Sequence, residues 1–233
     1  MPSVAQLAVA IAVKLLVLVL VVGVLRNGLH RQCWSFLAYL VMIFIYGTLE
    51  LAGILFYGWP GLEWPRLLWN RDFWHFKQTA YEVIKLGVAI ELGARVVAAF
   101  PGTWRTARAL LVLTLLTTTA AVALGDTPQH PLLGTATIWL FACASLVVTF
   151  FRLPIRSWYR ALLMGFVSYL FVFTTLTGLF AAWGFEAAKV LGSIDQVAYF
   201  VLVAWWTYSA WRGEERLEGI RPEILRRLGL QTA

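Results

Sequence analysis

Charged residues are scarce in this chain of 233 residues. Asp, Glu, Lys and Arg together make up 13 % of it, which is low because soluble domains contain ~25 % of such residues. Hydrophobic residues make up 61 %, and there are two cysteines. This composition excludes a water-soluble globular domain, a disordered chain and a disulfide-stabilised scaffold.

Sequence motifs for catalysis and cofactor binding are also missing. HExxH and GxSxG do not occur, and Gly125-Asp126 lacks the rest of an intramembrane aspartyl protease signature. His30, His75 and His130 fall in predicted loops, which disfavours a haem between helices. The predicted last helix has no lysine for a retinal Schiff base, and no spacing of ligand residues matches a metal motif. We therefore expect a non-enzymatic protein without cofactor or metal.

Long apolar runs, in contrast, fill most of the chain. One membrane crossing takes roughly 20 apolar residues, and a lone crossing segment must be a helix because lipid offers its backbone no hydrogen-bond partner. Residues 1–212 are therefore predicted to form an all-α bundle of seven transmembrane helices, and residues 213–233 a cytoplasmic tail. The apolar runs are 4–25, 34–57, 78–100, 107–124, 132–151, 161–183 and 194–211.

The positions of Lys and Arg predict the orientation of the bundle. Twelve of them flank the side that contains the turn after the first run, and four flank the other side. Cytoplasmic loops carry the excess of positive charge, so we expect the N-terminus outside and the C-terminus in the cytoplasm of a bacterial inner membrane. The net charge of +7 then faces anionic lipid headgroups rather than nucleic acid.

Two segments outside the apolar runs are distinctive. The outer loop, 58–77, contains four tryptophans, which are expected to anchor it in the headgroup region or to roof the bundle as a re-entrant piece. The tail, 213–233, places apolar residues at helical spacing between Glu and Arg. It is predicted to be an amphipathic helix on the inner leaflet, or alternatively a docking segment for a protein partner.

Six ionisable residues fall inside the predicted crossings. Each costs at least ~2.5–3.5 kcal/mol at a helix centre, so such groups normally face the bundle and are paired or hydrated. At ~1.5 Å per residue, Glu50 and Lys85 lie at the same depth below the outer surface. We interpret the six as an ion-pair network that packs the first three helices, or as an outward-open polar pocket for a ligand or proton. They are Lys14, Glu50, Glu82, Lys85, Glu91 and Arg95.

Helical periodicity divides the charges of the third crossing between two faces. At ~100° per residue, Glu82 and Lys85 share one face, while Glu91 and Arg95 lie on nearly the opposite one. The third helix is then surrounded by other helices, or Arg95 extends to the inner rim. A shifted helix end would instead place Glu82 or Arg95 among the headgroups.

Three further residues are assigned structural roles. Asp195 follows Gly192-Ser193-Ile194 and is expected to cap the last helix at the outer surface. Cys33 and Cys143 lie at different predicted depths, so we expect no disulfide between them and treat each as a small hydrophobic residue.

Seven short stretches carry a likeness to known sequences: 26–31, 34–40, 81–92, 101–102, 151–154, 165–166 and 204–208. In these stretches the chain resembles a group of uncharacterised bacterial seven-helix integral membrane proteins. The resemblance covers most of the chain. It implies a seven-helix bundle without an assigned activity, and it transfers no catalytic residue.

Three functional hypotheses follow from these observations. The leading one is a membrane sensor or interaction module with an outward-facing polar site and a cytoplasmic tail. A small-molecule or proton-coupled transporter that uses the buried carboxylates is the second. The third is a structural subunit of a larger membrane complex, for which twelve tryptophans and short loops are suited.

Overall fold

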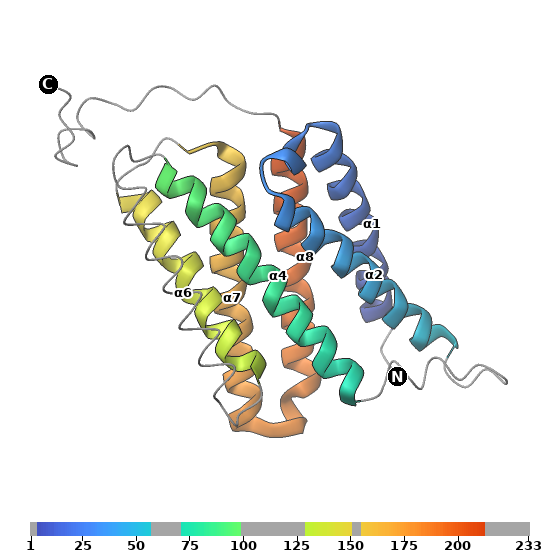
Figure 1. Cartoon of the computed structure of the whole chain (residues 1–233). Helices are drawn as coiled ribbons and strands as arrows, with labels where there is room; N and C mark the ends of the chain where they lie inside the picture. Colours follow the sequence, from blue (N-terminus) through green and yellow to red (C-terminus); the bar gives the residue numbers. More distant parts are fainter. Residues whose placement is uncertain (1–3, 57–70, 99–128, 151–154, 213–233) are drawn as a thin grey trace, which may run out of the picture.

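The computed structural model describes residues 4–56, 71–98, 129–150 and 155–212, and their regular structure is helical throughout. This confirms the predicted all-α fold. The six long helices (Figure 1) are α1 (Val4–Arg26), α2 (Trp34–Phe56), α4 (Arg71–Ala98), α6 (Gln129–Phe150), α7 (Ser157–Trp183) and α8 (Ala188–Trp211). Two short 3-10 helices, η1 (Leu29–Arg31) and η2 (Gly184–Ala187), precede α2 and α8.

Four of these helices are long and apolar enough to cross a membrane. Apolar side chains also cover their outer faces; for example, Leu15 on α1 is 59 % exposed and Phe171 on α7 is 71 % exposed. Such surfaces match lipid tails better than water, and they indicate a multi-pass protein in a lipid bilayer. The apolar spans are Leu7–Arg26, Trp34–Phe56, Ser157–Phe180 and Val190–Trp211.

Several helices begin earlier than the apolar runs predict. α4 begins at Arg71 rather than at 78, and α8 begins at Ala188 rather than at 194. Hydropathy marks only the apolar part of a helix, whereas the backbone hydrogen bonds continue through polar turns at its ends. The last seven residues of the predicted outer loop, 58–77, are therefore helical, and Lys189 lies in the first turn of α8.

Three predicted segments lie wholly or partly outside the described residues. They are the fourth crossing, 107–124, the first part of the outer loop, 58–70, and the tail, 213–233.

The six helices pack as a closed ring in the order α1, α2, α4, α6, α7, α8 and back to α1. In Figure 1, α1, α4, α6 and α8 run in one direction and α2 and α7 in the other. We divide the ring into two halves along the helix axes. The aromatic half is the one in which α1 and α8 end and α2 and α7 begin. The opposite half, where α1, α4 and α8 begin and α2 ends, is the polar half.

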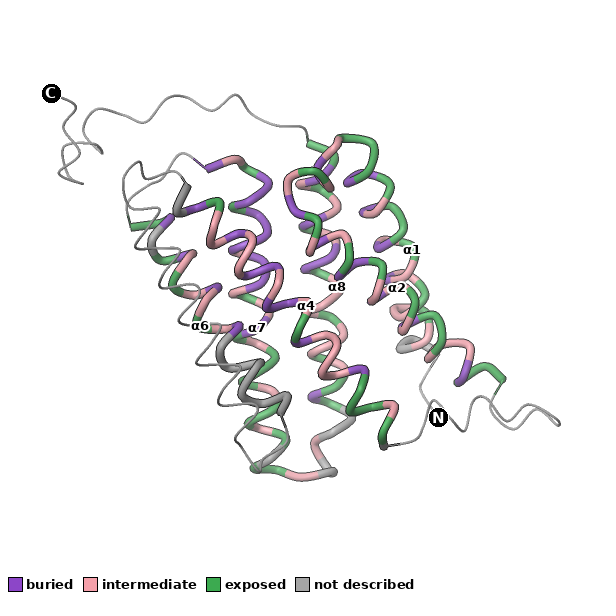
Figure 2. Tube along the Cα trace, in the orientation of Figure 1, coloured by how far each residue is buried: buried purple, intermediate pink, exposed green. Residues whose placement is uncertain are grey.

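Large aromatic side chains fill the aromatic half. Phe36, Phe166 and Trp206 are fully buried, with ring centroids 5.1 Å apart for Phe36–Trp206 and 4.7 Å for Phe166–Trp206. The indole of Trp206 lies directly on Gly165 and donates a hydrogen bond of 3.3 Å to the carbonyl of Ala161. Figure 2 shows the matching concentration of buried residues in the first half of α7.

Two hydrogen bonds and a cation–π contact join the ends of α1 and α8 in the aromatic half. The Asn27 side chain donates a hydrogen bond of 2.7 Å to the Ala210 carbonyl. Trp211 donates one of 3.2 Å to the Val19 carbonyl, and the Arg26 guanidinium lies 5.6 Å from the Trp211 ring centroid. These contacts fix the last turn of α8 against α1.

Candidate functional site

An ion pair between α2 and α4 is the first polar feature of the polar half. Lys77 donates a hydrogen bond to Glu50, and its ammonium also lies 3.5 Å from the Trp74 ring centroid. Each residue is six positions from the nearby end of its helix, roughly 9 Å along the axis, so the two side chains meet at one level. The Lys77 side chain is buried, whereas that of Glu50 is 38 % exposed.

A third charged group, Lys14 of α1, joins this pair. Lys14 interacts electrostatically with both Glu50 and Lys77. Its ammonium occupies the space that a Cβ atom at Gly47 of α2 would take, so a glycine is needed there for the close approach. We call Lys14, Glu50 and Lys77 the outer ionic cluster. It holds two lysine side chains and one carboxylate, a formal net charge of +1.

Glu82 and Lys85 form a second ion pair, within α4. The Lys85 ammonium donates a hydrogen bond of 2.5 Å to Glu82, and both residues are buried. They share a helix face, as their spacing of three residues predicts. The structure does not pair Lys85 with Glu50, because Lys77 lies at the level of Glu50. The second Glu82 oxygen has no hydrogen-bond partner among the described residues.

Glu91 caps the first turn of α2. Its two carboxylate oxygens accept hydrogen bonds from the backbone N–H groups of Ser35, at 3.0 Å, and Trp34, at 3.3 Å. These N–H groups have no partner within their own helix, and the helix dipole also favours an anion at this position. Arg95, one turn further along α4, is exposed. The sequence identified Glu91 as a charged residue inside the membrane, but it could not show which backbone N–H groups would donate hydrogen bonds to it.

The cap also affects Cys33, the residue before α2. Burial and the nearby Glu91 carboxylate raise the pKa of the Cys33 thiol to about 12. The thiol is therefore protonated at neutral pH and unreactive, since the thiolate is the nucleophile. Both cysteines are free, as expected.

We predict that Glu91→Gln lowers the free energy of unfolding by about 1–2 kcal/mol, because the neutral amide offers one oxygen instead of two and loses the interaction with the helix dipole. Chemical or thermal unfolding in detergent measures this loss. Alkylation of Cys33 should also become faster, because the carboxylate no longer opposes ionisation of the thiol. Arg95→Gln is the matched control: it should leave the stability unchanged, and it should slow rather than speed the alkylation, because the Arg95 charge lowers the pKa of Cys33. Equal stability of both variants would show that the cap is dispensable.

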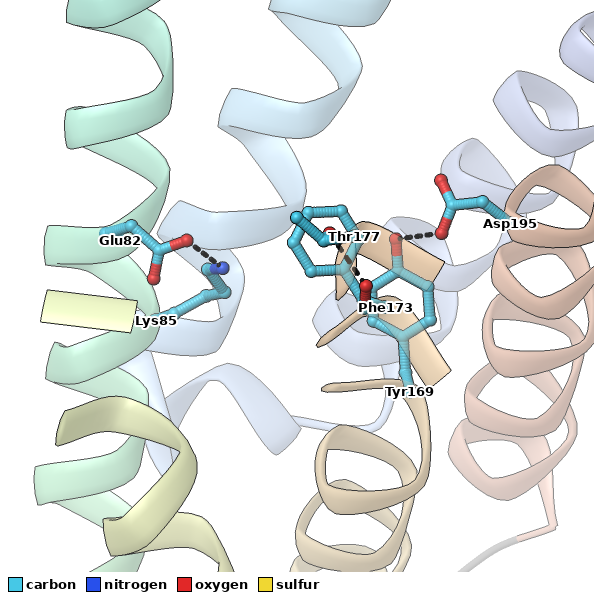
Figure 3. Close-up of polar contacts among 6 residues, drawn as sticks. All are labelled: Glu82, Lys85, Tyr169, Phe173, Thr177 and Asp195. Carbon is cyan, nitrogen blue, oxygen red and sulfur yellow. Dashed lines mark hydrogen bonds and ion pairs between the residues drawn. The ribbon is translucent and has the colours of Figure 1, made fainter. Parts of the chain in front are cut away.

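A further group of polar side chains lies among α2, α4, α7 and α8. The Tyr169 hydroxyl donates a hydrogen bond of 3.2 Å to Asp195 (Figure 3). Tyr39 interacts electrostatically with Asp195 and with Glu82. The prediction that Asp195 caps the last helix was wrong, because α8 begins seven residues earlier and Asp195 lies in its second turn.

Several threonines of α7 are satisfied locally. Thr174 and Thr177 donate hydrogen bonds to carbonyls three or four residues earlier in their own helix, and Figure 3 shows the contact of Thr177 with the Phe173 carbonyl. This is the usual arrangement for hydroxyls in an apolar environment. They therefore add no polar group to the interior.

These geometries define what the polar half can do chemically. No group of three or more His, Cys, Asp or Glu side chains within the described ranges could hold a metal ion. The outer ionic cluster presents excess positive charge beside a partly exposed carboxylate, so it suits a small anion. Comparison of the chain with models of protein families, with curated proteins and with solved structures finds no match.

Proposed function

We propose that this protein is a non-enzymatic membrane sensor that binds a small anionic solute at the outer ionic cluster. The observation that carries the proposal is that two lysine side chains, Lys14 and Lys77, lie near a single carboxylate, Glu50, within the bundle. An uncompensated charge in this environment is unfavourable, and an anion beside Lys14 would neutralise it. The partial exposure of Glu50 supports access of a solute to this position.

The proposed topology has seven crossings, with the N-terminus outside. α4 and α6 pack side by side and run in the same direction (Figure 1). α4 therefore ends and α6 begins at opposite ends of the bundle, which supports the expected crossing at 107–124. The ends of the described helices in the aromatic half are rich in arginine, which supports a cytoplasmic location for that half. These arginines are Arg26, Arg31, Arg156, Arg160 and Arg212.

Anion binding is tested with the full chain in lipid nanodiscs. Acetate and inorganic phosphate are titrated at constant ionic strength, and the rise in unfolding temperature reports binding to the folded state. We expect Lys14→Met to weaken the binding of the better probe by about 10- to 100-fold, the equivalent of one lost charged hydrogen bond. Gly47→Ala should weaken it too, because the added methyl group displaces the Lys14 ammonium while the flexible lysine preserves the fold.

Arg95→Gln is the control, since it removes an exposed positive charge remote from the cluster. Equal weakening by Arg95→Gln and Lys14→Met would indicate general charge attraction and contradict a specific site. No binding of either anion would contradict the proposal directly.

An anion carrier is the second candidate. The buried Glu82–Lys85 pair favours it, because this pair lies deeper on the same helix as Lys77 and could receive the solute after the outer ionic cluster. Uptake of the bound anion into proteoliposomes, lost in Glu82→Gln/Lys85→Met while the unfolding temperature is kept, would identify a carrier. Binding without uptake is the result expected for a sensor.

A further inference from the structure

Asp195 is an acid inside the ring of helices that none of the ion pairs described above includes. It lies seven residues after the start of α8, roughly 10 Å along the helix, and within the apolar span Val190–Trp211. Its hydrogen-bond partner is the neutral Tyr169 hydroxyl on α7. Figure 3 shows this pair on the α7–α8 side of the view and the Glu82–Lys85 pair on the α4 side.

Tyrosine side chains of three helices, α2, α7 and α8, interact with Asp195. Besides Tyr169, the side chains of Tyr39 on α2 and Tyr199 on α8 interact with it electrostatically, and Tyr81 on α4 interacts with both Tyr39 and Tyr199. The Tyr199 hydroxyl is buried and has no hydrogen-bond partner in the part of the chain that the structure describes. A phenol can donate a hydrogen bond to a carboxylate and accept one from a carboxylic acid.

Three described cations on the surrounding helices interact with groups other than Asp195. Lys85 on α4 pairs with Glu82. On α1, Lys14 interacts with Glu50 and Lys77, and Arg26 lies against Trp211 at the far end of the bundle. Within the described residues, no ion pair joins the Asp195 carboxylate to a cation, and the groups that interact with it are the phenols of Tyr39, Tyr169 and Tyr199.

The space around Asp195 is occupied by rings rather than by further ligand atoms. The ring centroids of Tyr169 and Tyr199 are 5.4 Å apart, and those of Tyr169 and Phe173 are 6.1 Å apart. A lone carboxylate in such surroundings is normally neutralised by taking up a proton. We propose that Asp195 is a proton-binding site, at which the carboxyl group exchanges a proton with the aqueous phase while the tyrosines hydrogen-bond to both of its forms.

The tyrosines Tyr39 and Tyr81 indicate the side of the bundle on which Asp195 exchanges its proton with water. Tyr39 interacts with Tyr81, and Tyr81 interacts with Glu50 of the outer ionic cluster. The proton leaves the Asp195 O–H group and is accepted by water at the polar half, and uptake is the reverse. This site is separate from the proposed anion site and stands without it.

Infrared difference spectroscopy of the full chain in nanodiscs tests the site. The carbonyl band of a protonated carboxylic acid is recorded from about pH 4 to about pH 10, a range that covers ordinary and strongly displaced carboxyl titrations. We expect a band that titrates with pH, shifts in D2O and disappears in Asp195→Asn. In Tyr169→Phe the band should move to a higher frequency, because the carbonyl loses its hydrogen-bond donor.

The double variant Glu82→Gln/Lys85→Met, which removes both charges of the neighbouring pair, is the matched control and should retain the band. A band that disappears in this double variant and persists in Asp195→Asn would place the proton on Glu82 and overturn the proposal. So would the absence of any titrating band, or a band that neither pH nor D2O alters. Asp195→Asn keeps the shape of the side chain, and its unfolding temperature checks that the fold is preserved.

Discussion

Lys85→Met is expected to lower the free energy of unfolding by about 3–5 kcal/mol, because Glu82 would remain buried without its cation. The pair sits on one face of α4, with the ammonium 2.5 Å from the carboxylate and both residues buried. Methionine has a similar length and keeps the packing of the side-chain stem. The loss therefore reports the unpaired charge rather than a cavity. Unfolding monitored by tryptophan fluorescence in detergent measures it.

The double variant Glu82→Gln/Lys85→Met removes both charges and should recover most of the lost stability. Replacing both partners of a buried pair is often nearly neutral, whereas removing one is strongly unfavourable. Arg95→Met supplies a matched control on the same helix, where the side chain is exposed. A double variant as unstable as Lys85→Met alone would show that the charges are not what holds α4 in place.

Trp206→Ala is likewise expected to cost about 3–5 kcal/mol, the usual range for deleting a large buried aromatic side chain. Trp206 is fully buried against Phe36 and Phe166, and its indole rests on Gly165. Its removal would leave a cavity among α2, α7 and α8 that rigid neighbouring rings cannot fill. The measurement is again the free energy of unfolding.

The neighbouring residue provides the control for this variant. Trp205 is 50 % exposed on the outer face of α8, so Trp205→Ala should change stability much less. Equal losses for the two variants would mean that the aromatic half is not the packed core of the bundle. Gly165→Val, which forces a side chain into the Trp206 indole, should destabilise by about 1–3 kcal/mol if the core is packed as described.

The helical class and the apolar spans could be predicted from the sequence because they depend on composition within a single segment. α1 and α2 match their apolar runs to within one residue at each end. α4 matches less well, because polar residues such as Arg71 and Lys77 belong to its helix while hydropathy assigned them to a loop. That shift of seven residues is what brings Lys77 rather than Lys85 to Glu50.

Contacts between segments far apart in the chain could be predicted less well. The spacing of Glu82 and Lys85 lies within one helix and indicated their shared face. The bonds from Ser35 to Glu91 and from Tyr169 to Asp195 each join two helices, and no local pattern shows where those helices cross. A tyrosine in an apolar run also resembles an ordinary core residue, so the sequence did not indicate that the tyrosines would gather around Asp195.

The contacts between the ends of α1 and α8 couple the positions of these two helices. α1 is an uninterrupted helix of 23 residues, about 34 Å long, with Lys14 near its middle and Arg26 at its end. Because Val19 and Arg26 contact Trp211, and Asn27 contacts Ala210, a tilt of α1 displaces the last turn of α8 directly. In the proposed sensor, a solute that draws Lys14 toward itself would tilt α1 and so displace the last turn of α8, which immediately precedes residue 213 in the sequence.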